Sequence, residues 1–187
     1  PLTDTHRDTT HYPKILTLLT HSHPSVCVVV AKMAAGGTHS MLLMQDGTLW
    51  GTGTNKLGQL GGGTTSTKFV YVPIKTLSGV KDVSAGWAHT LAVKEDGSLW
   101  ATGDNSHGNL GDGTRGSGNH KSKFERVISS GVEAVFAGDG FSAIVKTDGT
   151  LWTAGFNDYG ALGFTDQTKT EFFPAISSGA KVVQVSA

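Results

Sequence analysis

The sequence predicts an all-β fold: a β-propeller with three four-stranded blades and one extra strand. Two observations support this prediction. A unit of about fifty residues occurs three times, with Trp50, Trp100 and Trp152 at intervals of 50 and 52 residues. Within each unit, short runs of β-forming residues alternate with Gly-rich turns. A fixed period of this size is typical of propellers, solenoids and other repeat arrays.

The second unit shows why each period should form four strands. The first two strands are expected at 80–85 and 89–94. An Asp-Gly pair follows at 96–97, and this pair between two β-forming runs favours a hairpin, because the turn requires positive φ. A third strand is expected at 98–104 and a fourth near 124–128, after a long polar loop. Four short antiparallel strands per period correspond to one propeller blade.

The repeat divides the chain into an N-terminal segment and three complete periods. Residues 1–29 do not match the unit and are compatible with the last strand of a preceding blade. The periods run over about 30–79, 80–131 and 132–181, and 182–187 repeats the strand that opens each unit. Known propellers need about four to eight blades to close. We therefore expect further blades, from the same longer chain or from another copy, to pair with the two ends of this arc.

Charge and composition exclude several function classes. Fifteen basic residues balance fifteen acidic ones, so the charge favours neither nucleic acid nor an anionic membrane. Because Cys27 is the single cysteine, the chain cannot form an intrachain disulfide. The sequence contains no apolar run of about 18 residues, so no membrane span is predicted. The sequence starts at Pro1 without a signal-peptide pattern, so we expect it to be processed or part of something longer.

The repeated positions resemble the repeat of the regulator of chromosome condensation family, including its bacterial branch. The resemblance covers roughly residues 30–187 and implies a propeller of about seven blades. Members of that family act as exchange factors for small GTPases, inhibit β-lactamases or belong to large secreted or surface proteins. The resemblance therefore implies a common scaffold rather than one function. In the first unit the pattern occupies Gly36, His39, Ser40, Trp50, Gly53, Asn55, Gly58, Leu60 and Gly61.

Most repeated polar and aromatic residues have a structural explanation. His39 and His89 are replaced by Phe141 in the third unit, so we expect an aromatic ring packed beside a Gly-rich turn, with the histidine bonded to backbone. The aspartates of the three Asp-Gly pairs are expected to act as turn residues. The tryptophans are expected to pack between blades rather than to form a platform for sugars. No catalytic set, metal site or cofactor site is expected, since His21, His23 and their neighbours lack a familiar set of zinc ligands.

Binding is expected where the repeat is broken, because loops that vary on a constant scaffold usually carry binding. Trp87 replaces the Gly37 and Asp139 of the other units. The loop 105–123 is longer than its counterpart in the first unit and is basic, whereas the equivalent loop of the third unit is acidic. The alternative is that these loops are merely solvated. The candidate binding residues are Trp87, Arg115, His120, Lys121, Lys123, Asp158 and Tyr159.

The first hypothesis is a non-enzymatic protein-interaction or assembly module, expected in a secreted, cell-surface or virion-surface protein. Its expected partners are a protein or additional propeller blades. The alternative is an enzyme-regulating or glycan-active propeller, similar to an exchange factor or an inhibitor. A glycan site would need acidic residues gathered at one end of the central channel, and the repeated acids are all turn residues.

Overall fold

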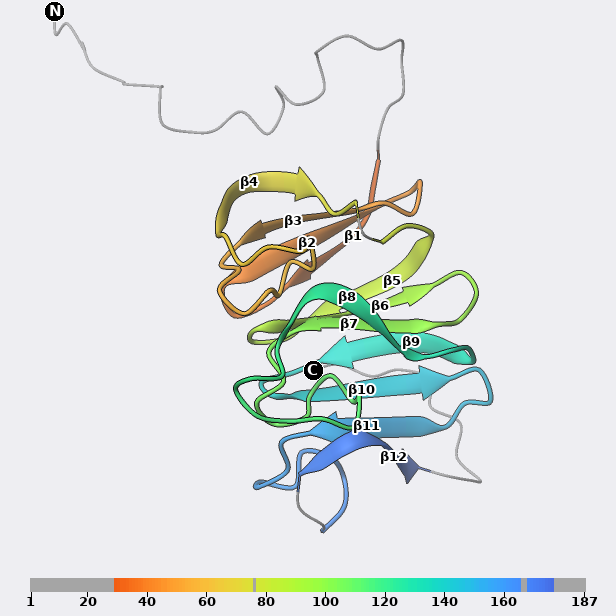
Figure 1. The fold of residues 1–187 in the computed structure, drawn as a ribbon. Coiled ribbons are helices and arrows are strands. Elements are labelled where there is room, and N and C mark those ends of the chain that lie inside the picture. The colour runs from red at the N-terminus through yellow and green to blue at the C-terminus, as the bar shows by residue number, and fades with distance from the viewer. Residues whose placement is uncertain (1–28, 76, 166–167, 177–187) are drawn as a thin grey trace, which may run out of the picture.

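The structure, a computed structural model, describes residues 29–75, 77–165 and 168–176 and contains three four-stranded antiparallel sheets (Figure 1). Each sheet keeps the order of the chain, so consecutive strands are hydrogen-bonded neighbours. No helix occurs within these ranges. The predicted all-β fold of three four-stranded blades is confirmed. The strands expected within 1–28 and 182–187 lie outside the described residues.

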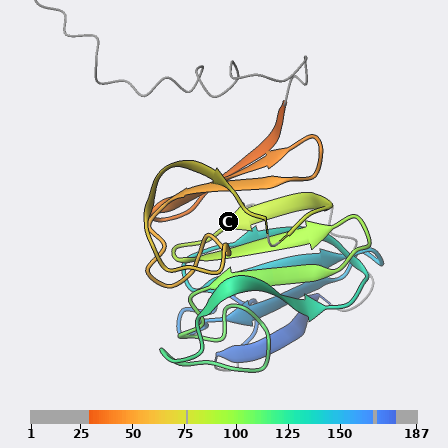
Figure 2. The same cartoon turned by 45° about the horizontal axis from the view of Figure 1, so that its top comes forward.

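The blades lie side by side with their sheet faces against one another (Figures 1 and 2). Blade 1 contains β1 (Val30–Ala35), β2 (His39–Met44), β3 (Leu49–Gly53) and β4 (Lys68–Pro73). Blade 2 contains β5 (Val80–Ala85), β6 (His89–Lys94), β7 (Leu99–Gly103) and β8 (Lys121–Ile128). Blade 3 contains β9 (Val132–Ala137), β10 (Phe141–Lys146), β11 (Leu151–Gly155) and β12 (Lys169–Ile176).

The outer strand of blade 2 is longer than the sequence predicted. It begins at Lys121, which is paired with Gly103, rather than near residue 124. Its first residues also contact the preceding blade: Gly63 N donates to Ser122 O at 2.7 Å, and Gly62 forms a β-bridge with Lys123. These contacts join residues about sixty positions apart, so local strand propensity could not reveal them.

The second and third strands of every blade are joined by the predicted Asp-Gly turn. Gly47, Gly97 and Gly149 have φ of +76°, +76° and +85°, a region that glycine adopts without strain. In the second turn, Asp96 Oδ1 accepts hydrogen bonds from Ser98 N at 2.9 Å and Ser98 Oγ at 2.5 Å. The other two turns repeat this pair of bonds with a threonine. The prediction that these aspartates serve the turns is confirmed.

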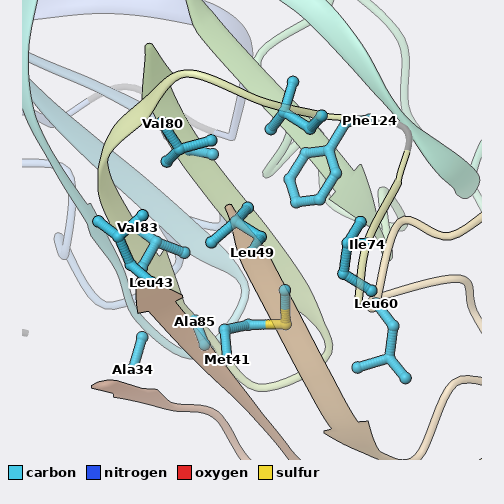
Figure 3. Close-up of a cluster of buried hydrophobic side chains, with 12 residues drawn as sticks. Ala34, Met41, Leu43, Leu49, Leu60, Ile74, Val80, Val83, Ala85 and Phe124 are labelled. Atoms are coloured by element: carbon cyan, nitrogen blue, oxygen red, sulfur yellow. The ribbon is translucent and has the colours of Figure 1, made fainter. Parts of the chain in front are cut away.

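Apolar side chains of adjacent blades form the cores between them. Between blades 1 and 2, Met41 and Leu49 of one sheet meet Val80 and Val83 of the next (Figure 3). Leu91, Leu99 and Leu110 of blade 2 meet Val132, Val135 and Ile144 of blade 3 in the same way. Each side chain named here is at most 2% exposed. Burying a side chain of this size stabilises the fold by about 1.5–3 kcal/mol, so the inter-blade faces hold the arc together.

The repeated tryptophans pack at the margins of these cores. Trp100 and Trp152 are half-buried, each against the cluster shared with the preceding blade. Their indole nitrogens donate to Ser98 Oγ at 2.9 Å and Thr150 Oγ1 at 2.8 Å. The prediction of packing between blades is confirmed for these two, although aliphatic residues fill the centre of each interface.

In blades 1 and 2, a Gly-rich loop packs against the outer strand of the next blade. We call residues 57–63 and 107–113 the clasp loops. A Cβ on Gly58 would lie 2.4 Å from Ser122 Cα, and a Cβ on Gly61 would lie 2.4 Å from the Phe124 ring. Gly111 faces Phe172 in the same way. The repeated glycines therefore allow the close approach of two backbones.

A repeated asparagine sets the shape of each clasp. Asn105 Oδ1 accepts a hydrogen bond from Leu110 N at 3.1 Å. Its Nδ2 donates to Thr114 Oγ1 at 2.8 Å. Asn55 and Asn157 make the equivalent bond to Leu60 N and Leu162 N, at 2.9 Å each. A buried amide thus replaces the backbone partners that a loop lacks.

The outer face of blade 1 differs from the matching faces of the other blades. Met33 is 65% exposed, whereas Val83 and Val135, at the same position of the repeat, are 0% and 1% exposed. Likewise Val30 is 48% exposed and Val80 is 2% exposed. Blade 1 therefore presents an apolar face of the kind that the preceding blade covers in blades 2 and 3.

Candidate functional site

The two ends of the blades carry different connections. The Asp-Gly turns lie at one end, which we call the hairpin end. The turns between the first and second strands and the long loops before the outer strands lie at the other, the loop end (left in Figure 1). The hairpin end keeps an Asp-Gly pair followed by Thr or Ser in all three blades, whereas the loop end differs at more positions from one blade to the next.

A groove runs across the loop end of blades 2 and 3. It consists of two adjoining hollows of about 320 and 350 Å³, which share His107, Asp139 and Gly140. Trp87 and Asp104 line the first hollow. The other lining residues that matter here are Leu57 and Ser106 in the first hollow, and Phe156 and Tyr159 in the second. We call this surface the loop-end groove.

Aromatic side chains form the two ends of the groove. Trp87 is 60% exposed, yet its ring is supported by Gly37, where a Cβ would lie 2.6 Å from the ring. Tyr159 is 91% exposed and packs edge-on against Phe156, with ring centroids 5.9 Å apart. His107 packs on the same phenylalanine at 4.8 Å. Large exposed rings held by neighbours are pre-organised for contact with a ligand.

Carboxylates lie between these aromatic groups. Asp104 is held by Ser106, whose backbone N donates to Oδ1 at 3.2 Å and whose Oγ donates to Oδ2 at 2.7 Å. Asp139 is exposed and forms no ion pair with any described residue. Among the described residues, no lysine or arginine lines either hollow. The groove therefore has negative charge without a local counter-ion.

The repeated histidines lie beneath the loop end and join neighbouring blades. His39 Nε2 is 2.8 Å from Thr90 Oγ1, and His89 Nε2 is 3.0 Å from Ser142 Oγ. Both hydroxyls donate their own protons to backbone carbonyls, Thr90 to Gln59 O at 2.7 Å and Ser142 to Asn109 O at 2.6 Å. The ring nitrogens must therefore act as donors in both pairs.

Burial keeps these histidines neutral. Desolvation lowers the pKa of His39 to about 4, and it lowers the pKa of His89 to about 4 although the nearby Asp104 opposes the change. Packing beside the Gly-rich turn is confirmed, since a Cβ on Gly86 would lie 2.3 Å from the His89 ring. The Nε2 partner of each histidine is a hydroxyl of the next blade, and His89 also makes the expected kind of backbone hydrogen bond, with Phe141. Each hydroxyl is about fifty residues away in sequence, so the contact depends on blade stacking.

The structure brings together only some of the predicted binding residues. Trp87 and Tyr159 line the groove, and Asp158 is exposed beside Tyr159. Arg115 and His120 are exposed on the loop after β7, away from the groove lining.

Two other predicted binding residues belong to contacts within and between blades. Lys121 Nζ lies 3.2 Å from Glu125 Oε2 and 3.7 Å from Asp112 Oδ2. Lys123 is at the β-bridge with the clasp loop of blade 1. These two lysines therefore contribute to the scaffold rather than to the groove.

Asp104, His107, Asp139 and Phe156 were missed as site residues. The sequence nevertheless contained a signal for them: most of the groove comes from three repeat positions that differ in every copy, and each of the three adjoins a glycine that recurs. These positions hold Gly37, Trp87 and Asp139; Thr54, Asp104 and Phe156; and Leu57, His107 and Tyr159.

The described residues show neither a metal-binding cluster nor a membrane-spanning helix. No group of three or more His, Cys, Asp or Glu side chains is placed to hold a metal ion in the described part of the chain. His21, His23 and Cys27 lie outside the described residues. The described ranges also contain no helix long and apolar enough to cross a membrane.

The repeats of this chain match models of a known repeat family. Two family models, both described as the Regulator of chromosome condensation (RCC1) repeat, match the chain. One matches residues 30–59, 80–109 and 132–161, and the other matches 46–93 and 148–187. No curated protein sequence gives a significant match.

Solved structures with the same fold are propellers of this kind. Prp20p from Saccharomyces cerevisiae is 20% identical with a TM-score of 0.73, over 88% of this chain and 42% of that chain. Yeast RCC1 (Prp20) bound to Kap60 is 20% identical with a TM-score of 0.70, over 87% and 40%. Human WBSCR16 is 21% identical with a TM-score of 0.69, over 82% and 39%. The chain thus spans about two fifths of the length of these solved relatives.

Proposed function

Because the chain belongs to the regulator of chromosome condensation (RCC1) repeat family, we propose that it is a non-enzymatic module that binds a protein partner through its loop-end groove. One observation carries this proposal. Three of the repeat positions that differ in every copy meet in a single groove, whereas the Asp-Gly turns, the clasp glycines and the loop asparagines recur.

The groove has the physical character of a protein contact surface. Trp87 and Tyr159 offer large rings on a rigid scaffold, so little side-chain freedom is lost on binding. Residues of these two types dominate the binding energy of many interfaces. Polar groups such as Asp104 and Ser106 lie between them, as expected for a patch that is solvated when free.

The polar groups of the groove support a role without catalysis. The Ser106 hydroxyl donates to Asp104 rather than to a histidine, so it is not activated as a nucleophile. His107 packs on Phe156, and His89 is buried with its Nε2 bonded to Ser142. The groove residues thus form no nucleophile–base pair among the described contacts.

Relatives with the same fold support a protein partner. Prp20p is described by its binding to Gsp1p and histones, and yeast RCC1 (Prp20) was solved bound to Kap60. The rival function is regulation of a small GTPase as an exchange factor. Acceleration of nucleotide release from small GTPases by the purified chain would favour that rival, and cleavage of polysaccharides would favour a glycan-active propeller. The secreted or surface location stays a prediction from composition.

Site-specific photo-crosslinking tests the proposed function. A photoreactive amino acid is placed at Trp87 or Tyr159 in the groove, and at Thr147 of the hairpin end as the matched exposed control. Each variant is exposed to extract of the native source. We expect the same protein to be captured from both groove positions and not from Thr147. Capture from Thr147 alone would overturn the proposal.

A second candidate role is assembly, and we infer that another blade of the same repeat covers the outer face of blade 1. Met33 and Val30 are exposed there, as described above. A hollow of about 380 Å³ in blade 1 is lined by Ser40 and Thr52. These are the repeat equivalents of Thr90 and Thr102, which in blade 2 bond to the loop of blade 1.

The covering blade could come from a longer form of the chain or from a second copy. Sedimentation of wild type and Met33→Asp distinguishes the cases for this chain. Self-association that Met33→Asp abolishes supports a second copy, because a charge would then be buried at the contact. A monomer that is equally soluble with either residue would contradict assembly of this chain with itself.

A further inference from the structure

We propose that the loop-end groove recognises an arginine- or lysine-bearing segment of its protein partner. The cation would lie beside Asp104 and Asp139, between the rings of Trp87 and Tyr159. This inference rests on the proposed function, because it names the chemistry that the same groove would select. It goes beyond that function by specifying the charge and side-chain type of the ligand.

The negative charge of the groove is not balanced by a basic residue of its lining in the described part of the chain. Asp104 and Asp139 both line it, and the linings contain no lysine or arginine among the described residues. Lys121 is engaged elsewhere, near Asp112 and Glu125 of its own blade. A ligand without a cation would displace water from the two carboxylates and put nothing in its place. The free-energy cost of desolvating the two charges would then oppose binding.

The aromatic rings of the groove lie where they can contact a cation. A guanidinium or ammonium group is attracted to the face of Trp or Tyr, and the attraction amounts to about 0.5–2 kcal/mol. Trp87 borders the hollow that contains both carboxylates, and Tyr159 borders the adjoining hollow, which also contains Asp139. One long cationic side chain can therefore contact a carboxylate and a ring at once.

The chain uses this chemistry within its own fold. Lys146 Nζ lies 3.7 Å from the centroid of the Trp152 ring, and Lys94 Nζ lies 5.5 Å from that of Trp100. In both cases the lysine is half-buried beside the ring. The exposed rings of Trp87 and Tyr159 have no cation of this chain above them among the described contacts.

A neutral oligosaccharide is the main competing ligand, since aromatic rings beside carboxylates also bind sugars. The groove favours the cation for a specific reason. Among the described contacts Asp139 has no ion-pair partner, and the Asp104 carboxylate accepts hydrogen bonds from the neutral Ser106 alone, so neither negative charge is balanced. A sugar would leave both charges unbalanced, whereas a basic side chain would neutralise them.

Peptide binding by the intact chain tests this inference. The probe is a fluorescent nine-residue peptide of alternating arginine and glycine, compared with the same peptide carrying glutamate and with a neutral oligosaccharide. We expect the arginine peptide alone to bind, and Asp139→Asn to weaken it about tenfold, which corresponds to about 1.4 kcal/mol. Trp87→Phe should leave binding nearly unchanged and Tyr159→Ala should weaken it several-fold.

The matched control is Asp158→Asn, which changes the net charge equally but alters an exposed residue outside the groove lining. Equal weakening by Asp158→Asn and Asp139→Asn would mean general electrostatic attraction and would overturn the proposal. Binding of the oligosaccharide instead of the peptide would also overturn it. If crosslinking from Trp87 and Tyr159 still captured a partner, the proposed function would stand without the cationic ligand; if it did not, both would fall.

Discussion

The hairpin end and the loop end are built from the same three repeats but differ in what stays constant. At the hairpin end, Asp46, Asp96 and Asp148 make the same two hydrogen bonds to the residue two positions later. At the loop end, several positions change in every copy, and three of them supply most of one groove. The comparison shows that a scaffold fixed by a few repeated contacts leaves the remaining loop positions free to specialise.

The loop end contains repeated, buried residues as well as variable, exposed ones. A fall in pH should have the largest effect on stability, and it acts through two of the repeated, buried residues. His39 and His89 are repeated and buried, with pKa values of about 4, below the ordinary 6.5. The unfolded chain therefore binds more protons than the folded chain as pH falls below about 6.5, so stability is lost progressively until about pH 4. Each histidine accounts for a loss of about 3 kcal/mol.

The histidine prediction can be checked with a residue that the repeat itself supplies. His89→Phe introduces the residue found at position 141, and it should remove roughly half of this histidine contribution. Denaturant unfolding at pH 7 and pH 5 measures the difference for both proteins. An unchanged pH dependence in His89→Phe would show that His89 is not kept neutral by burial.

Clasp glycines give the next largest effect. Gly58 and Gly160 occupy the same repeat position with φ of +82° and +76°. A Cβ on Gly58 would meet Ser122 Cα at 2.4 Å, whereas one on Gly160 meets nothing within 4 Å among the described atoms. Gly58→Ala should lower the free energy of unfolding by about 3 kcal/mol and Gly160→Ala by about 1 kcal/mol, the cost of positive φ alone.

Thermal unfolding of both alanine variants measures that difference directly. Both variants carry the cost of alanine at positive φ. The additional loss of stability in Gly58→Ala therefore measures the contact between the clasp loop and Ser122. Equal losses would mean that the clasp loop moves aside without cost, and the repeated glycines would then need another explanation.

A smaller effect is expected at the hairpin end. Asp96→Ala removes both hydrogen bonds from Ser98 to the turn, so we expect the melting temperature to fall by a few degrees (about 2–4 °C). The same hydrogen bonds lower the pKa of the Asp96 carboxyl, so the turn should also weaken as this group is protonated in acid. Partner binding measured in parallel should not change. If Asp96→Ala lost partner binding while remaining folded, the hairpin end would also take part in binding, which would contradict the distinction between the two ends.

The smallest effect on stability is expected in the groove. Tyr159→His places at 159 the residue that stands at the equivalent position 107. Because Tyr159 is 91% exposed, we expect the free energy of unfolding to change by less than about 0.5 kcal/mol. Binding of the arginine peptide should weaken several-fold. Unfolding and peptide titration of one preparation check both parts, and a large stability loss would place Tyr159 in the scaffold.

The repeat predicted the scaffold well because local residues determine it. Asp-Gly turns and alternating apolar residues lie within one blade, so a single unit was sufficient to place them. Contacts between blades were harder: the partner of His89 is Ser142, 53 positions away. Lys121 and Lys123 looked like loop residues because the clasp that orders them comes from blade 1. The groove was only half found, since Asp104 and His107 become neighbours of Asp139 only when blades stack.

Hydroxyl-radical footprinting of the complex isolated from the native source tests the central claim most directly. The measured quantity is the oxidation of each side chain with and without the bound partner. We predict that Trp87 and Tyr159 lose reactivity in the complex while the exposed residues of the hairpin end, such as Thr147, keep theirs. Protection of the hairpin end with full reactivity of Trp87 and Tyr159 would contradict the account.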